Sequence, residues 1–181
     1  MFPWITYNGV DYADSQFIIE FLSKEFGKHL NARLDVKQAA IARCALKTCE
    51  ESIRWCGVLH RFVYSGDPSV VGLPSIAMKI MKSRTLSYTY GQGYGRHTKE
   101  EVYSIGKADL KAIDDLIGDN KFLFGDEPCE TDACVFGSLA QVLYHDRGPF
   151  NEFATSLLYS LNSIVIFWVK KIKRVKKVKT F

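Results

Sequence analysis

Apolar residues recur at intervals of three or four through most of this chain, which is the spacing of one buried face of an α-helix. One such pattern begins after Asp35 and continues to about Tyr64, which predicts a single long helix. Shorter patterns predict helices over residues 16–26, 76–90 and about 130–144. The chain is therefore predicted to be mainly α-helical.

The first residues depart from this pattern. Two β-rich segments, Trp4 to Tyr7 and Val10 to Tyr12, flank Asn8-Gly9. Asn-Gly is the strongest short signal for a two-residue hairpin turn. The sequence thus predicts a β-hairpin that leads into a helix, and either Asp14 or Ser15 is expected to cap that helix.

A tight turn and a helix start are predicted within residues 122–137. The turn is Gly125-Asp126-Glu127-Pro128, because Gly relaxes the backbone, Asp bonds back to it and Pro blocks continuation. With Cys129 as the N-cap, the Asp132 carboxylate can accept a hydrogen bond from the amide of the cap, which is half of a capping box. The other half is weak because sulfur is a poorer acceptor than oxygen. Asp132 is therefore interpreted as a structural acid, and Cys129→Thr is expected to stabilise the fold.

The glycine-rich segment from Gly91 to Arg96 suggests a phosphate-binding loop, since alternating glycines can expose backbone amides. A dinucleotide loop follows a strand, however, and a P-loop ends in Lys followed by Ser or Thr. Neither feature is expected here. The segment is instead predicted to end one helix and to lead to the capping box Thr98-Lys-Glu-Glu101.

Length and composition describe a globular chain. Its 181 residues suffice for one ordinary domain, or for a small domain and part of another, and 47% of them are hydrophobic. The first residues resemble no cleavable signal, and the five cysteines are an odd number, so a reducing intracellular compartment is expected. No run reaches the roughly eighteen apolar residues of a membrane span.

The net charge of +4 conceals a basic tail. Without the seven bases of the tail, 17 basic and 20 acidic residues remain. As a helix, the tail would form a narrow apolar seam edged by cations, which suits an anionic membrane surface, with each base adding about 1 kcal/mol. Nucleic acid attracts the same charge but is the less favoured partner, and a solvated tail without a partner is the remaining alternative. The seven bases are Lys170, Lys171, Lys173, Arg174, Lys176, Lys177 and Lys179.

Three residues that could be soft metal ligands lie near one face of the long predicted helix. Cys49, Cys56 and His60 could offer sulfur and nitrogen to zinc or cadmium. No C-x₂-C pair accompanies them, and free Cys is among the most buried residue types. Core packing is the preferred interpretation, and no metal site is predicted.

Three motifs carry a resemblance to a known family. The segment from Phe122 to Ala133 resembles the helix-initiating segment in the all-helical domain of glutathione S-transferase-like proteins. The following Val135-Phe-Gly and Leu139-Ala-Gln are similar to the failed axon connections and metaxin-related branch, which includes cadmium-responsive nematode proteins. Gly95-Arg-His-Thr98, followed by Glu100-Glu101, resembles a recurring linker signature of that family. The resemblance covers nearly residues 2 to 160.

The resemblance implies a glutathione S-transferase-like fold in three parts. Residues 1–30 would form a truncated thioredoxin-like domain, consisting of the hairpin and one helix. Residues 33–168 would form an all-helical C-terminal domain, and residues 169–181 the basic tail.

The resemblance also implies where glutathione would bind. Pro3 falls where the thioredoxin-like fold commonly places a cis-proline. Asp14 and Ser15 fall on the acidic-Ser pair that holds the γ-glutamyl end of glutathione in relatives. A hydroxyl and free amides at a helix N-terminus attract a carboxylate. On the sequence alone, simple capping of the helix is the preferred role of this pair.

The expected function follows from the family resemblance and from a catalytic segment that is expected to be missing. A full thioredoxin-like domain opens with a strand, a helix and a second strand, and the segment that presents an activating Tyr, Ser or Cys is expected to be missing. The chain is thus expected to be a non-catalytic, cytoplasmic interaction or scaffold protein without a cofactor, bound to a protein partner, to a second copy or to a membrane face. The alternative is a glutathione-dependent transferase acting in detoxification or stress response. A metal-response role is less favoured.

Overall fold

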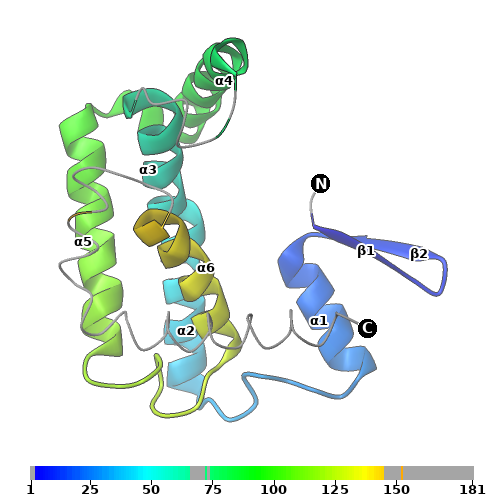
Figure 1. Ribbon diagram of the computed structural model, residues 1–181. Helices are drawn as coiled ribbons and strands as arrows, with labels where there is room; N and C mark the ends of the chain where they lie inside the picture. Colours follow the sequence, from blue (N-terminus) through cyan, green and yellow to red (C-terminus); the bar gives the residue numbers. More distant parts are fainter. Residues whose placement is uncertain (1–2, 66–71, 73, 145–151, 153–181) are drawn as a thin grey trace. The chain divides into compact units, whose positions relative to one another are not determined.

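The computed structural model describes residues 3–65, 72, 74–144 and 152 (Figure 1). It divides the chain into two compact units, Met1–Asp35 and Val36–Phe181. The sequence also predicts a break at Gly148-Pro149 followed by a final helix. That segment and the basic tail lie outside the described residues.

The first unit opens with a two-stranded antiparallel hairpin, as predicted. Strand β1 (Trp4–Tyr7) pairs with β2 (Val10–Ala13), and the two central turn residues have positive φ angles of 50° at Asn8 and 78° at Gly9. Asn and Gly adopt such angles more readily than other residues, and this backbone matches the twist of the paired strands. The Asn-Gly signal therefore fixes the register of the hairpin.

Helix α1 (Ser15–Glu25) follows the hairpin and packs on it through aromatic rings. The rings of Tyr12 and Phe21 stack with centroids 3.8 Å apart, and Tyr7 meets the edge of Phe21 at 5.4 Å. Ile18 is buried beside them. This small aromatic cluster holds the helix against the strands.

The second unit begins with the long helix, whose predicted extent is confirmed. It runs without a break through α2 (Val36–Thr48), η1 (Cys49–Ile53), α3 (Arg54–Leu59) and η2 (His60–Tyr64). The segments η1 and η2 are π-helical, so the amides of the next residues bond to carbonyls five residues back. The sequence pattern did not predict this difference in hydrogen bonding. The apolar spacing of this helix predicts one stripe formed by Ile41, Ala45, Cys49, Ile53, Cys56 and His60. All of these residues are buried except Ile41, which is partly exposed.

Two further helices and a short connector follow. Helix α4 (Ser75–Gln92) ends at Gly93, whose φ of 116° favours glycine. A 3₁₀ turn, η4 (Tyr94–Arg96), then leads to α5 (Lys99–Ile117). The α5 helix starts with the predicted capping box, in which the Thr98 and Glu101 side chains each bond to the other's backbone amide. The predicted helix stop and helix start are both confirmed.

Helix α6 (Glu130–Tyr144) and α5 lie alongside the long helix and enclose the core (Figure 1). The sequence pattern predicts that Ala133, Phe136, Leu139, Ala140 and Leu143 face inward on α6. In the structure Leu139 is buried as predicted, but Ala133 is exposed, and the other buried apolar residues are Val135 and Val142. The buried stripe begins with Thr131 and Asp132 and lies about one residue earlier along the helix than expected. The largest fully buried side chains of the core are Phe122, Ile53, Leu59, Leu110, Ile117, Leu139, Val102 and Val135.

No helix among the described residues has both the length and the apolar character needed to cross a bilayer.

Candidate functional site

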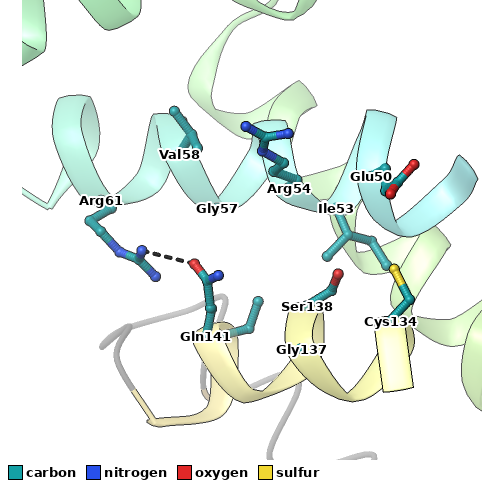
Figure 2. Close-up of a pocket in the computed structure, with 11 residues that line it drawn as sticks. Glu50, Ile53, Arg54, Gly57, Val58, Arg61, Cys134, Gly137, Ser138 and Gln141 are labelled. Atoms are coloured by element: carbon teal, nitrogen blue, oxygen red, sulfur yellow. Dashed lines mark hydrogen bonds between the residues drawn. The ribbon is translucent and has the colours of Figure 1, made fainter. Parts of the chain in front are cut away.

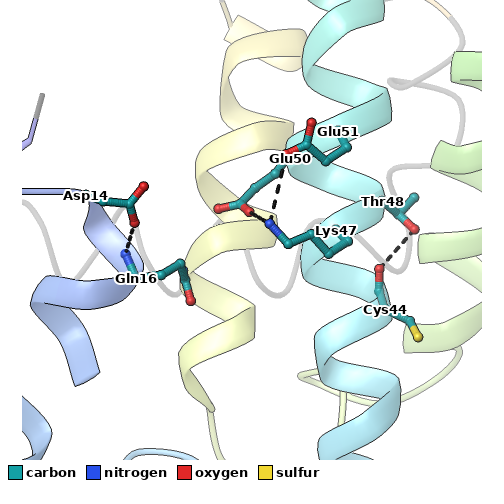
Figure 3. Close-up of polar contacts among 7 residues, drawn as sticks. All are labelled: Asp14, Gln16, Cys44, Lys47, Thr48, Glu50 and Glu51. Atoms are coloured by element: carbon teal, nitrogen blue, oxygen red, sulfur yellow. Dashed lines mark hydrogen bonds and ion pairs between the residues drawn. The ribbon is translucent and has the colours of Figure 1, made fainter. Parts of the chain in front are cut away.

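The predicted glutathione turn lies at the start of α1. Asp14 has φ 75° and ψ 128°, an unusual backbone conformation for a residue with a side chain, and its Oδ1 accepts a hydrogen bond of 2.9 Å from the amide of Gln16 (Figure 3). The amide of Asp14 donates to the carbonyl of Pro3 at 3.2 Å. Ser15 is the first helical residue and is exposed. The structure thus brings all three predicted residues together, and Asp14 caps the helix.

Strained residues of this kind cost about 1–3 kcal/mol and cluster at ligand-binding turns. The turn presents the exposed Ser15 beside the first amides of a helix, which is suitable for a carboxylate. The turn therefore supplies groups that can bind a carboxylate.

The hydroxyl of Tyr7, one of the phenols of this unit, is already engaged. It donates a hydrogen bond of 2.9 Å to Oε1 of Glu25. That hydrogen bond raises the pKa of Tyr7 above its ordinary value, with smaller contributions from burial and from the charge of Glu25. A phenol that activates glutathione would need the opposite shift. Tyr7 therefore has a structural role in joining β1 to α1.

The predicted cap of α6 is present and more extensive than expected. Oδ2 of Asp132 accepts a hydrogen bond of 2.7 Å from the amide of Cys129, which is the bond that the spacing predicts. Its Oδ1 accepts a second bond of 2.8 Å from the amide of Leu123. Asp132 has no exposed surface. It ties the start of α6 to the turn before it, in keeping with a structural acid.

A cavity of about 310 Å³ lies between the long helix and α6 (Figure 2). Its lining includes two residues without side chains, Gly57 on the long helix and Gly137 on α6. Arg61 spans the opening, and its Nη1 donates a hydrogen bond of 3.1 Å to Oε1 of Gln141. The residues that line the cavity are Glu50, Ile53, Arg54, Gly57, Val58, Arg61, Cys134, Gly137, Ser138, Gln141 and Val142.

The ionic groups around this cavity are partly neutralised. Nζ of Lys47 lies 3.0 Å from Oε2 of Glu50 and 3.9 Å from Oε1 of Glu51 (Figure 3). The basic residues that line the cavity are Arg54 and Arg61. Sequence reasoning missed these residues, although the spacing of seven places both arginines on one face of a helix.

The thiols near the cavity are held in the neutral form. Burial raises the pKa of Cys49 to about 12, with a further increase from the neighbouring Cys134 and a decrease from a hydrogen bond with Ser138. Burial, together with Glu50 and Glu130, raises the pKa of Cys134 to about 11. Burial also raises the pKa of Cys56 to about 12. Thiolates are the reactive form of cysteine, so these groups are poor nucleophiles near neutral pH.

The loosely spaced metal ligands of the long helix are each engaged by other groups. The thiol of Cys56 donates to the carbonyl of Val102 at 3.4 Å, and Nδ1 of His60 lies 2.8 Å from the hydroxyl of Tyr103. Within the part of the chain that the structure describes, no three His, Cys, Asp or Glu side chains gather as a metal site.

A polar cluster that the sequence did not predict joins three segments of the helical unit. The hydroxyl of Ser52, in η1, is hydrogen-bonded to the carboxylate of Asp109 and to the hydroxyl of Tyr94. The signal in the sequence was Tyr94 itself, a large aromatic residue between two glycines. The cluster anchors the glycine-rich connector to the long helix and to α5.

Comparisons with known proteins agree with this architecture. Residues 1–66 match the family model described as glutathione S-transferase N-terminal domain, and residues 106–166 match glutathione S-transferase, C-terminal domain. By its fold and by these two matches, the chain is a glutathione S-transferase-like protein.

Two known proteins are similar to this chain in sequence. The chain is 28% identical over 175 residues to Failed axon connections of Drosophila melanogaster, covering 84% of this chain and 42% of the relative. It is also 28% identical over 148 residues to an isoprene-epoxide–glutathione S-transferase of Rhodococcus sp. (strain AD45), covering 75% of this chain and 62% of the relative. No solved structure matches the chain. Within the glutathione S-transferase-like proteins, the chain is thus similar to Failed axon connections as well as to a transferase, and it spans less than two thirds of either relative.

Proposed function

We propose that this protein is a non-catalytic intracellular interaction protein, and that one surface of α4 is a contact site. This α4 face consists of Ile76, Lys79, Ile80, Arg84, Ser87 and Tyr90. Ile76 is 74% exposed, Ile80 53% and Tyr90 62%. Large apolar side chains gathered on one exposed helix face are typical of interaction sites. This is the observation that carries the proposal.

The chemistry of the described residues supports a role in binding. Conjugation to glutathione requires a group that stabilises the thiolate of the tripeptide. The Tyr7 hydroxyl is engaged by Glu25, and the pKa values of the thiols that line the core are raised. The free cysteines of the described residues are in keeping with a reducing compartment, which supports a cytoplasmic location.

The proposal is tested by placing a photo-crosslinking amino acid at Tyr88, which is exposed on α4, and for comparison at Glu20, which is exposed on α1. In extracts of the source cells that retain their membranes, position 88 should give one dominant crosslinked species, either protein or lipid, and position 20 should not. Identification of that species by mass spectrometry then names the partner. Equal, diffuse crosslinking from both positions would contradict the proposal.

The second candidate is a glutathione-dependent transferase, and the geometry of Asp14 favours it. A residue held at φ 75° beside a free hydroxyl suits the recognition of the α-amino-acid end of a ligand. One relative is, by its name, a transferase that joins an isoprene epoxide to glutathione. In this chain, Pro3, Asp14 and Ser15 of this turn would bind glutathione.

The two candidate functions predict different rates of glutathione conjugation. For the interaction protein, the rate at which glutathione reacts with 1-chloro-2,4-dinitrobenzene or with an epoxide should equal the protein-free rate. A faster rate that Ser15→Ala abolishes would establish the transferase. The matched control is Ser23→Ala, which lies elsewhere on α1. Retention on immobilised glutathione without turnover would show that the turn binds but does not catalyse.

A further inference from the structure

Helix α4 carries its apolar residues on the side that faces away from the protein. At about 100° per residue, its buried residues Met78, Thr85 and Thr89 share one face. Ile76 and Ile80 project from the opposite face, and Tyr90 lies on the same side as these two. The buried face holds two threonines and one methionine, so the more apolar half of the helix is exposed. This arrangement is the reverse of an ordinary surface helix.

The Lys, Arg, Asp and Glu residues in and next to this helix are all basic. Residues 68–99 contain no acid and five bases, namely Lys79, Lys82, Arg84, Arg96 and Lys99. Lys79 and Arg84 flank the α4 face on its two sides. Arg96 lies over the ring of Tyr90, with its guanidinium 5.3 Å from the ring centroid. Apart from this segment and the tail, the chain holds 12 bases and 20 acids, a net charge of −8. The positive charge is thus concentrated in two places.

We propose that the α4 face lies on an anionic phospholipid surface, with Ile76, Ile80 and Tyr90 in the headgroup region and Lys79 and Arg84 at lipid phosphates. The proposal rests on the proposed interaction function and names the partner of its contact site. Interfacial helices combine apolar residues with Lys and Arg whose long side chains reach the headgroups. Tyrosine is enriched at the same depth because its ring is apolar and its hydroxyl is polar.

A bilayer fits this face better than another protein does. A helix that docks in a protein groove uses a narrow stripe at i, i+3 or i+4, and i+7. On α4, large side chains spread further, since Leu86 is 42% exposed and Tyr88 71% exposed at the two borders of the face. A helix half embedded in headgroups can cover so broad an arc. A second copy of α4 would bring like charges together, which opposes self-association through this face.

The test is co-sedimentation of the full chain with vesicles of phosphatidylcholine containing 30% phosphatidylserine, and with vesicles of phosphatidylcholine alone. Binding to the anionic vesicles should be strong at low salt and weaker at high salt. The double variant Ile76→Ser with Ile80→Ser should reduce the partition coefficient at least tenfold. Lys79→Gln with Arg84→Gln should reduce it similarly and should weaken its salt dependence.

Matched controls exist on α2. Val36 is 91% exposed, and Arg43 is exposed on the same helix. Val36→Ser with Arg43→Gln should leave vesicle binding unchanged. Circular dichroism and urea unfolding should show that all variants remain folded. Replacing the seven bases of the tail by Gln in the full chain separates its contribution, and a partition that still depends on Ile76 and Ile80 supports the proposal.

Two outcomes would overturn the inference. One is vesicle binding that the α4 variants do not change. The other is binding of poly-L-glutamate that depends on Lys79 and Arg84 without any vesicle binding, which would indicate an acidic protein partner. Both outcomes leave the interaction function standing. The proposed function itself fails if the same preparation turns over glutathione.

Discussion

Asp132 has no exposed surface, yet each of its carboxylate oxygens accepts a hydrogen bond from a backbone amide. A buried carboxylate is stable only when such donors satisfy it. Its spacing from Cys129 made the first bond predictable. The second bond joins Leu123, nine residues away, and depends on how the preceding turn closes. A local pattern of residues does not contain that information.

Asp132→Ala should lower the free energy of unfolding by about 2–5 kcal/mol, because two buried amides lose their acceptor. Urea unfolding followed by circular dichroism measures the change. Asp119→Ala, at an exposed position after α5, should change it by less than about 0.5 kcal/mol. Similar losses in the two variants would contradict the structural role of Asp132.

Cys129→Thr should raise the free energy of unfolding by about 0.5–1 kcal/mol, because a hydroxyl caps a helix better than a thiol does. The melting temperature is the readout. Since Cys129 is buried, Cys129→Ser separates the effect of the hydroxyl from that of the added methyl group. A fall in stability for both variants would show that the cap of α6 does not rely on this side chain.

Among the elements, the connector between α4 and α5 is the most dependent on glycine. A Cβ atom at Gly95 would lie 2.6 Å from the amide nitrogen of Tyr90 and 2.7 Å from Oγ1 of Thr89. At Gly91, a Cβ would meet nothing within 4 Å. The glycines that suggested a phosphate loop thus serve close packing, and Gly95 lets the connector lie against the end of α4.

Gly95→Ala should therefore lower the free energy of unfolding by about 1–3 kcal/mol through steric crowding. Gly91→Ala, within α4, should leave it unchanged or raise it by up to about 1 kcal/mol, because Ala is the better helix former. Chemical unfolding of the two variants side by side gives the comparison. The prediction fails if both substitutions have the same sign and size.

The sequence predicted most elements because their signals are local. Apolar spacing, capping residues and Asn-Gly placed the hairpin, the long helix, α4, α5 and α6. Spacings of three and four are also compatible with a few π-helical turns, so the pattern did not reveal η1 and η2. The cavity was not predicted either, because residues that line it, such as Gly57 and Gly137, come from segments eighty residues apart in the chain.

For the whole molecule, the buried thiols couple stability to alkaline pH. Burial raises the pKa of Cys49 and Cys56 to about 12, and of Cys129 and Cys134 to about 11. The unfolded chain releases these protons at lower pH, near the ordinary value of a thiol. Above about pH 8.5 the unfolded state binds fewer protons than the folded state, so stability falls as pH rises.

The loss should reach at most about 1.4 kcal/mol per pH unit for each thiol, and it should be absent below about pH 8. Urea unfolding between pH 7 and pH 11 measures it. Cys134→Ser should make the decline shallower between about pH 9 and pH 11. Cys44→Ser, at an exposed position, should leave the slope unchanged. An equal slope in the two variants would exclude a contribution from Cys134.

The two π-helical segments have a consequence for insertions and deletions in related sequences. Each segment holds one residue more than an α-helix needs to keep its two ends in phase. A relative shorter by one residue within Cys49–Ile53 or His60–Tyr64 can form plain α-helix there and keep the flanking faces aligned. A residue lost from α2 would instead rotate all that follows by about 100°. Alignment gaps in this helix should therefore fall at these two places.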